Sequence, residues 1–282
     1  MKYPNLSEEK RLWKKGFKSV IGLDEAGRGP LAGPVVAAAV NILDTRYQIP
    51  AFTKVSAGRQ NIKIRDSKQL TFSQREKIYK IIIKDHQLQW GIGVVSEKII
   101  DRINILEATK LAMIKAVKNL QQRKYQLKIT KSILSQKPTI VGKEGKIDFL
   151  ISNKTRNKIF LILDGNFILP TNSTFVVTST KEAALTKIGI KKLIPQKSII
   201  RGDEKVFSCS AASIIAKVTR DRIMVKLHKK YPKYRFDLHK GYGTKLHLKM
   251  LNKYGPCEIH RKTFEPIFKY IDRGFRESII KL

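Results

Sequence analysis

Acidic residues are scarce in this sequence. Its 282 residues include 23 Asp and Glu against 57 Lys and Arg, which gives a formal net charge of +34. A surplus of this size attracts polyanions over a Debye length or more, so nucleic acid is the first partner class to consider. The chain is also rich in Lys and Ile throughout, as coding biased towards A and T would produce. The charge therefore suggests a class of partner and cannot establish it alone.

Cysteines and long apolar runs are scarce as well. Cys209 and Cys257 are the only cysteines and neither belongs to a CxxC pair, which argues against a zinc site or a disulfide framework. The longest mostly apolar stretch, residues 31–43, is broken by Pro34 and Asn41 and is shorter than the roughly 20 residues that a membrane span needs. The N-terminus lacks the apolar region of a secretory signal. We therefore expect a cytoplasmic protein without a membrane partner.

The remainder of the chain follows an α/β pattern. Residues 1–17 form a polar lead-in with helical potential, and residues 18–282 form the folded domain, whose C-terminal part is helical from about residue 229. Short apolar runs predict strands over residues 19–23, 35–42, 88–95 and 159–163. Helical spacing predicts helices over residues 73–85 with Ser73 as N-cap, for about four turns from Asn104, over 207–228 and over 244–251. Such elements predict a sheet covered by helices.

Three stretches show no sustained periodicity of apolar residues and are expected to be insertions: residues 45–65, 121–158 and 171–191. The middle stretch contains ten Lys or Arg and two acidic residues. Long irregular loops in compact domains are either functional or disordered. A variable surface insertion and a binding arm both remain possible interpretations of this basic segment.

Two of the apolar runs end in a carboxylate, at Asp24 and at Asp164. Neighbouring strands of this kind would place both carboxylates at one edge of a sheet, facing a common crevice. Glu25 can join Asp24 only if the pleat breaks there, because adjacent strand residues normally point to opposite faces. Gly27 and Gly29, just beyond, make such a break plausible.

Clustered carboxylates raise one another's pKa and cost stability unless a cation joins them. Hard Mg²⁺ prefers oxygen ligands and keeps open positions for water and phosphate. Two such ions about 4 Å apart can stabilise the attacking and leaving oxygens of a phosphodiester displacement. An isolated Asp-Glu pair at a turn, however, is usually only solvated.

Longer sequence motifs strengthen this interpretation. Six motifs occur in a fixed order between residues 19 and 264: IGLDEAGRGPLAGPVV, RDSKQL, ILEATKLAM, LILDGN, RGDEKVFSCSAASIIAKVTRDR and HKGYGTKLH. Together they closely resemble ribonuclease HII, the type 2 ribonuclease H family. The resemblance implies a ribonuclease H-like fold, with a five-stranded mixed sheet flanked by helices and a helical C-terminal part. It also implies hydrolysis of RNA in RNA/DNA hybrids and incision 5′ of a ribonucleotide embedded in duplex DNA, with Mg²⁺ or Mn²⁺ as cofactor and 5′-phosphate and 3′-hydroxyl ends.

Matched by motif, Asp24 and Glu25 correspond to the family's first two metal ligands, and Asp164 corresponds to the third. The fourth acidic position lies in a KGD-like motif before SAAS, which here reads RGD and points to Asp203. Arginine in place of the usual lysine keeps the charge but not the hydrogen-bond geometry. Asp221 is the competing candidate, although it lies four residues after Lys217 on a predicted helix and could simply pair with it.

The resemblance also implies substrate-binding residues. Gly27, Arg28 and Gly29 match the element that grips the ribonucleotide, and glycines let the backbone approach a sugar closely. Tyr242 matches the tyrosine that stacks on the following sugar and enforces the RNA-to-DNA step.

Further candidate contacts come from residue type. Ser67 and Lys68 have the character of phosphate ligands, or of a helix-capping serine beside a solvated lysine. Ser210 and Ser213 either contact the DNA backbone or pack under the sheet. A basic duplex-binding face is expected from His239, Lys240, His260 and Arg261.

Two alternatives remain. Ribonuclease HIII shares the fold and carboxylates, but the GRG motif, Tyr242 and the absence of a long N-terminal substrate-binding domain argue against it. A non-catalytic basic nucleic-acid-binding protein would bind tightly and salt-sensitively without cleavage. The family is mostly monomeric, so a monomer is expected, and no contact with a replication clamp is evident from the sequence.

Overall fold

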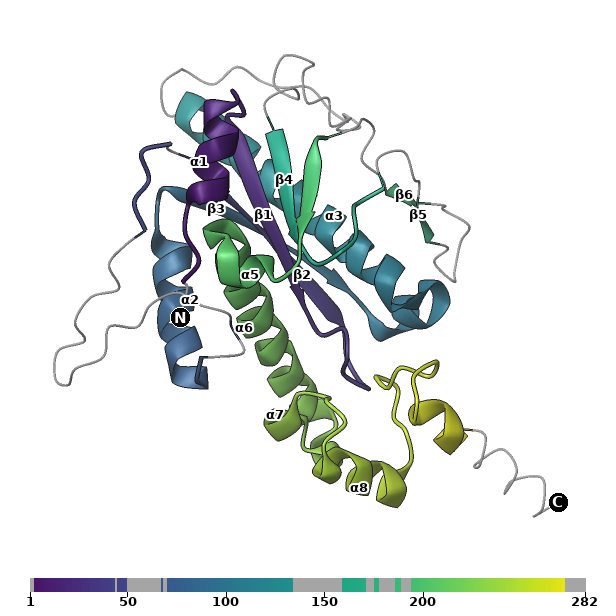
Figure 1. The fold of residues 1–282 in the computed structure, drawn as a ribbon. Helices are drawn as coiled ribbons and strands as arrows, with labels where there is room; N and C mark the ends of the chain where they lie inside the picture. The colour runs from purple at the N-terminus through teal and green to yellow at the C-terminus, as the bar shows by residue number, and fades with distance from the viewer. Residues whose placement is uncertain are drawn as a thin grey trace, which may run out of the picture.

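The computed structural model describes residues 3–43, 45–49, 67, 70–133, 159–170, 175–177, 186–188 and 194–271. Its centre is a five-stranded sheet in the order β3-β2-β1-β4-β7 (Figure 1). The strands are β1 (Ser19–Ala26), β2 (Val35–Ile42), β3 (Leu88–Val95), β4 (Ile159–Asp164) and β7 (Gln196–Ile199). β1, β2 and β3 pair antiparallel, whereas β4 pairs parallel with both β1 and β7. The expected mixed sheet is confirmed.

Helices α2 (Phe72–Lys84) and α6 (Phe207–Lys230) cover one face of this sheet (Figure 1). Ala38, Val40 and Ile42 of β2 pack there in one apolar cluster with residues of both helices. A capping box at Thr71 starts α2, because the Thr71 hydroxyl accepts from the Gln74 N–H and the Gln74 side chain accepts from the Thr71 N–H. The prediction of Ser73 as the cap was therefore wrong by two residues.

Helix α3 (Glu97–Ile133) covers the opposite face, packing against Ala37 and Ala39 of β2. Its backbone breaks at Asn104, which has a φ of 66° and whose side chain accepts from the N–H groups of Leu106 and Glu107. Asn104 thus opens a helix as predicted, but a shorter helical segment precedes it. The helix also continues to Ile133, so the expected irregular stretch is helical over residues 121–133. That segment has no Gly or Pro to stop the helix.

The N-terminal lead-in contains α1 (Ser7–Lys14), which packs on the sheet (Figure 1). Leu12 is buried with Val20 and Ile162, and the fully buried Glu9 accepts a 2.9 Å hydrogen bond from the N–H of Ser208. The lead-in is consequently part of the packed structure.

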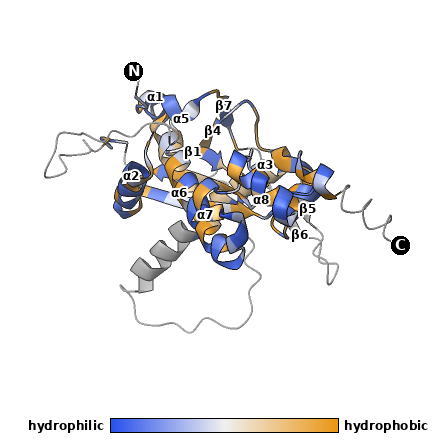
Figure 2. Cartoon of the chain, turned by 90° about the horizontal axis from the view of Figure 1, so that it is seen from below, coloured by the Kyte–Doolittle hydropathy of each residue, from blue (hydrophilic) through white to orange (hydrophobic). Residues whose placement is uncertain are grey.

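The C-terminal part lies beyond the end of α6 and contains η2 (Pro232–Tyr234), α7 (Phe236–His239) and α8 (Lys245–Tyr254). It has an apolar cluster of its own, in which residues 31–32 of the β1–β2 connection join Phe236 and Leu251. Figure 2 shows hydrophilic and hydrophobic residues side by side on these helices, as in amphipathic helices that cover a core. Within the described ranges, no helix is both long and apolar enough to cross a bilayer.

Several elements differ from the sequence expectation. β1 runs to Ala26 rather than stopping at Asp24, and β7 and α5 (Gly202–Lys205) were not predicted. The expected irregular stretch 171–191 contains the antiparallel pair β5 (Phe175–Val177) and β6 (Thr186–Ile188). Residues 51–65 and 134–158 of the other two stretches lie outside the described residues.

Candidate active site

The strand register brings Asp24 and Asp164 together. β1 and β4 are parallel neighbours in which Leu23 lies opposite Leu163, so the next residue on each strand is an aspartate. Asp24 pairs with Ala38, which faces α6, and therefore its side chain is on the α6 face as well. The prediction that two strands present their carboxylates at one place is confirmed.

Asp203, in the first turn of α5, supplies a third carboxylate. One oxygen each from Asp24, Asp164 and Asp203 lies within 4.8 Å of the other two. Asp24 and Asp203 are buried, whereas Asp164 is partly exposed. The N–H of Gly202 donates a 2.7 Å hydrogen bond to Asp164 Oδ1, which ties the start of α5 to the end of β4.

Holding these carboxylates close together costs electrostatic free energy. Burial raises the pKa of Asp24 well above its usual range, and the charges of Glu25, Asp164 and Asp203 raise it further. A hydrogen bond from Ser213 acts in the opposite direction. A divalent cation would remove this repulsion, and an all-oxygen donor set open to solvent at Asp164 fits a hard ion such as Mg²⁺ or Mn²⁺.

Glu25 is placed differently from the other three acidic residues. β-pairing continues through Ala26, so the pleat does not break at Glu25, contrary to the expectation. Its strand partner is Ala37, which faces α3, so Glu25 leaves the backbone on the face opposite Asp24. Its Oε1 lies 3.3 Å from Arg28 Nη1.

Asp221 has a separate contact on α6. Its Oδ1 accepts a 2.8 Å hydrogen bond from Lys217 Nζ, one helical turn earlier. This i,i+4 pair is the structural alternative considered for Asp221. Asp203, and not Asp221, lies in the carboxylate group with Asp24 and Asp164.

The turn at residues 27–29 follows directly on β1. Gly27 is buried with a φ of 99°, a left-handed backbone conformation that favours glycine. Arg28 and Gly29 are exposed. The turn therefore presents its exposed residues 28 and 29 to solvent four and five residues from Asp24 along the chain.

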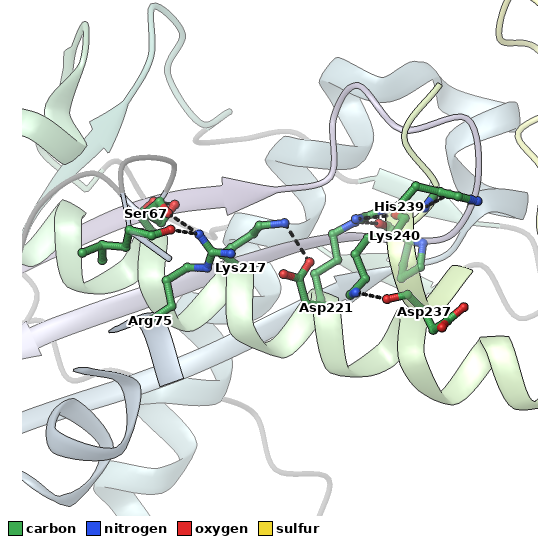
Figure 3. Close-up of polar contacts among 12 residues, drawn as sticks. Ser67, Arg75, Lys217, Asp221, Asp237, His239 and Lys240 are labelled. Carbon is green, nitrogen blue, oxygen red and sulfur yellow. Dashed lines mark hydrogen bonds and ion pairs between the residues drawn. The ribbon is translucent and has the colours of Figure 1, made fainter. Parts of the chain in front are cut away.

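Tyr242 follows α7, and its side chain lies over two cations of α6. It is 39% exposed, with Lys217 Nζ 5.5 Å and the Arg220 guanidinium carbon 5.6 Å from its ring centroid. Figure 3 shows Lys217 and Asp221 on α6 between Ser67 and Lys240. A row of polar and basic side chains thus leads towards the loop that carries Tyr242.

The serines considered as phosphate or DNA-backbone contacts are buried. Ser67 is 3% exposed, and its hydroxyl shares a 2.9 Å hydrogen bond with Ser213. Ser210 is fully buried. Of the two open interpretations, packing under the sheet describes Ser210 and Ser213. Lys68 lies outside the described residues.

The prediction of a basic duplex-binding face is wrong for three of its four residues. His239, His260 and Arg261 are buried, at 8%, 1% and 0% exposed, and only Lys240 is partly exposed. Arg261 and the equally buried Arg220 hold the loops that carry residues 27–29 and 242. Sequence reasoning missed this contact, because no local pattern separates a buried arginine from the many surface cations of a basic chain.

This geometry fits one class of protein. Carboxylates gathered from β1, β4 and α5, in a mixed sheet with helices on both faces, agree with the ribonuclease H-like fold and the divalent-metal-dependent nuclease that the resemblance implies.

Comparison with known proteins identifies the family. The model of the family Ribonuclease HII matches residues 21–162 and 157–267. The chain is 38% identical over 274 residues to the ribonuclease HII of Chlamydia trachomatis serovar A, covering 95% of this chain and 94% of the relative. It therefore belongs to the ribonuclease HII family and is an endoribonuclease of the ribonuclease H type, a class that acts on RNA/DNA hybrids and depends on divalent metal.

Solved structures agree with this assignment. The ribonuclease H2 of Pyrococcus horikoshii OT3 has a TM-score of 0.54 at 28% identity, covering 92% of this chain and 99% of that one. A structure of the PCNA:RNase HII complex from Archaeoglobus fulgidus has a TM-score of 0.50 at 20% identity, covering 88% of this chain and 95% of that one, and shows the fold alone.

Proposed function

We propose that this chain incises duplex DNA on the 5′ side of an embedded ribonucleotide and also hydrolyses the RNA strand of RNA/DNA hybrids, leaving 5′-phosphate and 3′-hydroxyl ends. The observation that carries the proposal is the convergence of Asp24, Asp164 and Asp203 within 4.8 Å, with Asp24 on the strand β1 that leads into the turn at residues 27–29. Such an enzyme would remove ribonucleotides from DNA in repair and replication.

Asp24, Asp164 and Asp203 would hold two divalent ions, and Glu25 would complete the set. The bound ions would polarise the scissile phosphate and supply a nucleophilic hydroxide at neutral pH. Glu25 leaves β1 on the other face, so it contributes only by reaching round the strand end, away from its contact with Arg28. The buried Asp24 and Asp203 would hold the ions from within the fold, and the partly exposed Asp164 would hold them on the solvent side.

The substrate would be selected by two elements. Backbone N–H and C=O groups of Gly27, Arg28 and Gly29 would bind the 2′-hydroxyl, which is the group that distinguishes RNA from DNA. The Tyr242 ring would stack on the next sugar and favour a deoxyribose there. Lys68, with Ser67 beside it, would contact phosphate.

We propose that the chain acts as a monomer and in the cytoplasm. No clamp contact is included in the proposal, because the Archaeoglobus fulgidus complex bears on the fold alone at 20% identity.

The test is incubation of the protein with a DNA duplex that carries one ribonucleotide, in Mg²⁺ and in Mn²⁺. We expect a single cut on the 5′ side of the ribonucleotide and no cut in an all-DNA duplex of the same sequence. Tight, salt-sensitive binding without incision in either metal would instead support the non-catalytic binding protein.

A further inference from the structure

Two arginines are completely buried where the C-terminal part meets the sheet. Arg220 on α6 and Arg261 after α8 are both 0% exposed. Their hydrogen bonds run to main-chain carbonyl oxygens, those of Gly27, Arg28, Ala32, Gly33, Pro34 and Lys240. The two guanidinium groups therefore bind loops rather than carboxylates in these contacts.

Arg261 holds the turn at residues 27–29. Its Nη2 donates to the carbonyl of Gly27 at 2.6 Å, and its Nη1 donates to that of Arg28 at 2.8 Å. The opposite side of the same guanidinium binds the carbonyl of Gly33. The first two residues of the turn and Gly33, farther along the same connection, are thus held by one planar group with five donors.

Arg220 links that turn to the loop of Tyr242. Its Nη1 donates to the carbonyl of Lys240 at 3.0 Å, while its Nε and Nη2 donate to those of Pro34 and Ala32. The same guanidinium lies 5.6 Å from the Tyr242 ring centroid. Arg220 therefore binds the β1–β2 connection just after the turn at residues 27–29 and also contacts the loop and ring of Tyr242.

The glycines on either side show how tightly the loops are packed on this group. A Cβ atom on Gly27 would lie 2.1 Å from Arg220 Nε. On Gly241 it would lie 2.6 Å from the carbonyl oxygen of Ala32. Neither loop can move towards the other without displacing Arg220 or the chain beneath it.

Stability alone does not explain two like charges at this position. Burial, followed by the charge of Arg220, lowers the pKa of Arg261 to about 9, so the pair is costly to keep charged. An apolar side chain at either position would avoid this cost, but it could not bind the carbonyl groups of the loops. The surrounding part also has its own apolar cluster, with Phe236 and Leu251.

We infer that Arg220 and Arg261 are positioning residues that fix the spacing between the turn at residues 27–29 and the Tyr242 ring, and thereby set the preference for an RNA-to-DNA step over a continuous hybrid. This inference rests on the function proposed above. A lysine keeps the charge but cannot hold three carbonyls in one plane, so Arg→Lys should loosen the spacing.

The test compares kcat/KM on two substrates, a DNA duplex with one ribonucleotide and a uniform RNA/DNA hybrid. The variants are Arg220→Lys and Arg261→Lys, with Arg222→Lys as the control. Arg222 lies on the same helix, is exposed and pairs with Glu76 at 2.6 Å. Within one preparation, the ratio of the two values does not depend on the folded fraction, because unfolded molecules cut neither substrate.

We expect the ratio to fall about 10-fold or more in both buried-arginine variants, since small displacements near a reacting centre cost up to about 100-fold. The ratio should be unchanged in Arg222→Lys. Adding Tyr242→Ala to Arg220→Lys should lower the ratio no further than Tyr242→Ala does by itself, because residues that act through one contact are not additive.

The outcomes are distinguishable. If the wild-type protein cuts neither substrate, the proposed function fails and the inference falls with it. If the wild type cuts both substrates without preference, the proposed cleavage stands and the inference is overturned. If the wild type prefers the single ribonucleotide but the lysine variants cut both substrates proportionally more slowly, only the inference is overturned. The same holds if neither lysine variant folds while Arg222→Lys does, because the arginines would then serve folding alone.

Discussion

Two regions of this molecule collect charges of one sign, and they deal with the repulsion differently. At the ends of β1 and β4, Asp24, Asp164 and Asp203 lie within 4.8 Å of one another, and burial with mutual repulsion raises the pKa of Asp24. Where the C-terminal part meets the sheet, Arg220 and Arg261 are fully buried and bind backbone carbonyls.

The two regions differ in whether the group that would bind the charges is an exchangeable ion or part of the chain itself. A metal ion exchanges with solvent, so chemistry at the carboxylates can be switched off by removing it. Carbonyl groups of the chain do not exchange, so the arrangement of the loops at Arg220 and Arg261 is built into the fold. Under the function proposed above, cutting and substrate choice would be carried by separate groups, the carboxylates on one side and the loops held by Arg220 and Arg261 on the other.

The largest expected effect is a difference in cleavage rate between a variant at Asp203 and a variant at Asp221. Asp203→Asn should lower the cleavage rate by at least about 100-fold, because a lost metal ligand removes several kcal/mol of charge stabilisation. Asp221→Asn breaks only the pair with Lys217 and should retain most of the activity. Single-turnover cleavage of the one-ribonucleotide duplex measures both variants. Equal losses would show that the carboxylate group is wrongly composed.

A smaller effect is expected at Tyr242. Tyr242→Ala should reduce the preference for the RNA–DNA junction by about 10-fold, since stacking on an aromatic ring contributes about 1–3 kcal/mol. Tyr254→Ala is the matched control, because Tyr254 is also 39% exposed and lies in the same C-terminal part. The measurement is kcat/KM on the one-ribonucleotide duplex and on the hybrid. A preference that survives in Tyr242→Ala would refute the stacking role.

The last effect concerns stability in acid rather than cleavage, and it should arise in the C-terminal part. Burial and the neighbouring histidines lower the pKa of His247 to about 4 and that of His260 to about 3, where Tyr234, His239 and Cys257 pack against them. Below an unfolded-state pKa of about 6.5 the unfolded chain takes up protons that the folded chain does not. The free energy of unfolding should therefore fall with pH from about 6.5 to about 4, by up to about 1.4 kcal/mol per pH unit for each histidine.

Thermal unfolding at about pH 7.5 and about pH 5 measures this effect. His260→Gln should narrow the difference in Tm between the two conditions, whereas His86→Gln, at an exposed position, should leave it as in the wild type. An unchanged difference in His260→Gln would assign the acid sensitivity to other groups.

Much of the fold could be predicted because its strands are apolar runs bounded by polar residues. β2 and β3 have the predicted bounds, Val35–Ile42 and Leu88–Val95. β7 was missed because QKSI is short and has no apolar period. The continuation of α3 to Ile133 was missed because its polar residues favour a helix without showing an apolar stripe.

The site was predictable where chain direction determines the geometry. Asp24 and Asp164 follow apolar runs, and parallel pairing alone brings them together. Asp203 required the family resemblance, because α5 approaches from outside the sheet. The side of the strand on which Glu25 lies depends on β1 continuing to Ala26, and the burial of Arg261 depends on tertiary packing. Neither leaves a local signal in the sequence.

The variant Asp24→Asn tests most directly whether cleavage and substrate preference are carried by separate groups. This variant should be assayed for cleavage in Mg²⁺ and for binding to a one-ribonucleotide duplex and to an all-DNA duplex. We predict that incision is abolished, because a metal ligand is lost, while binding still favours the duplex with the ribonucleotide, because the turn at residues 27–29 and Tyr242 are intact. Incision near the wild-type rate, or loss of the binding preference together with the activity, would contradict the account.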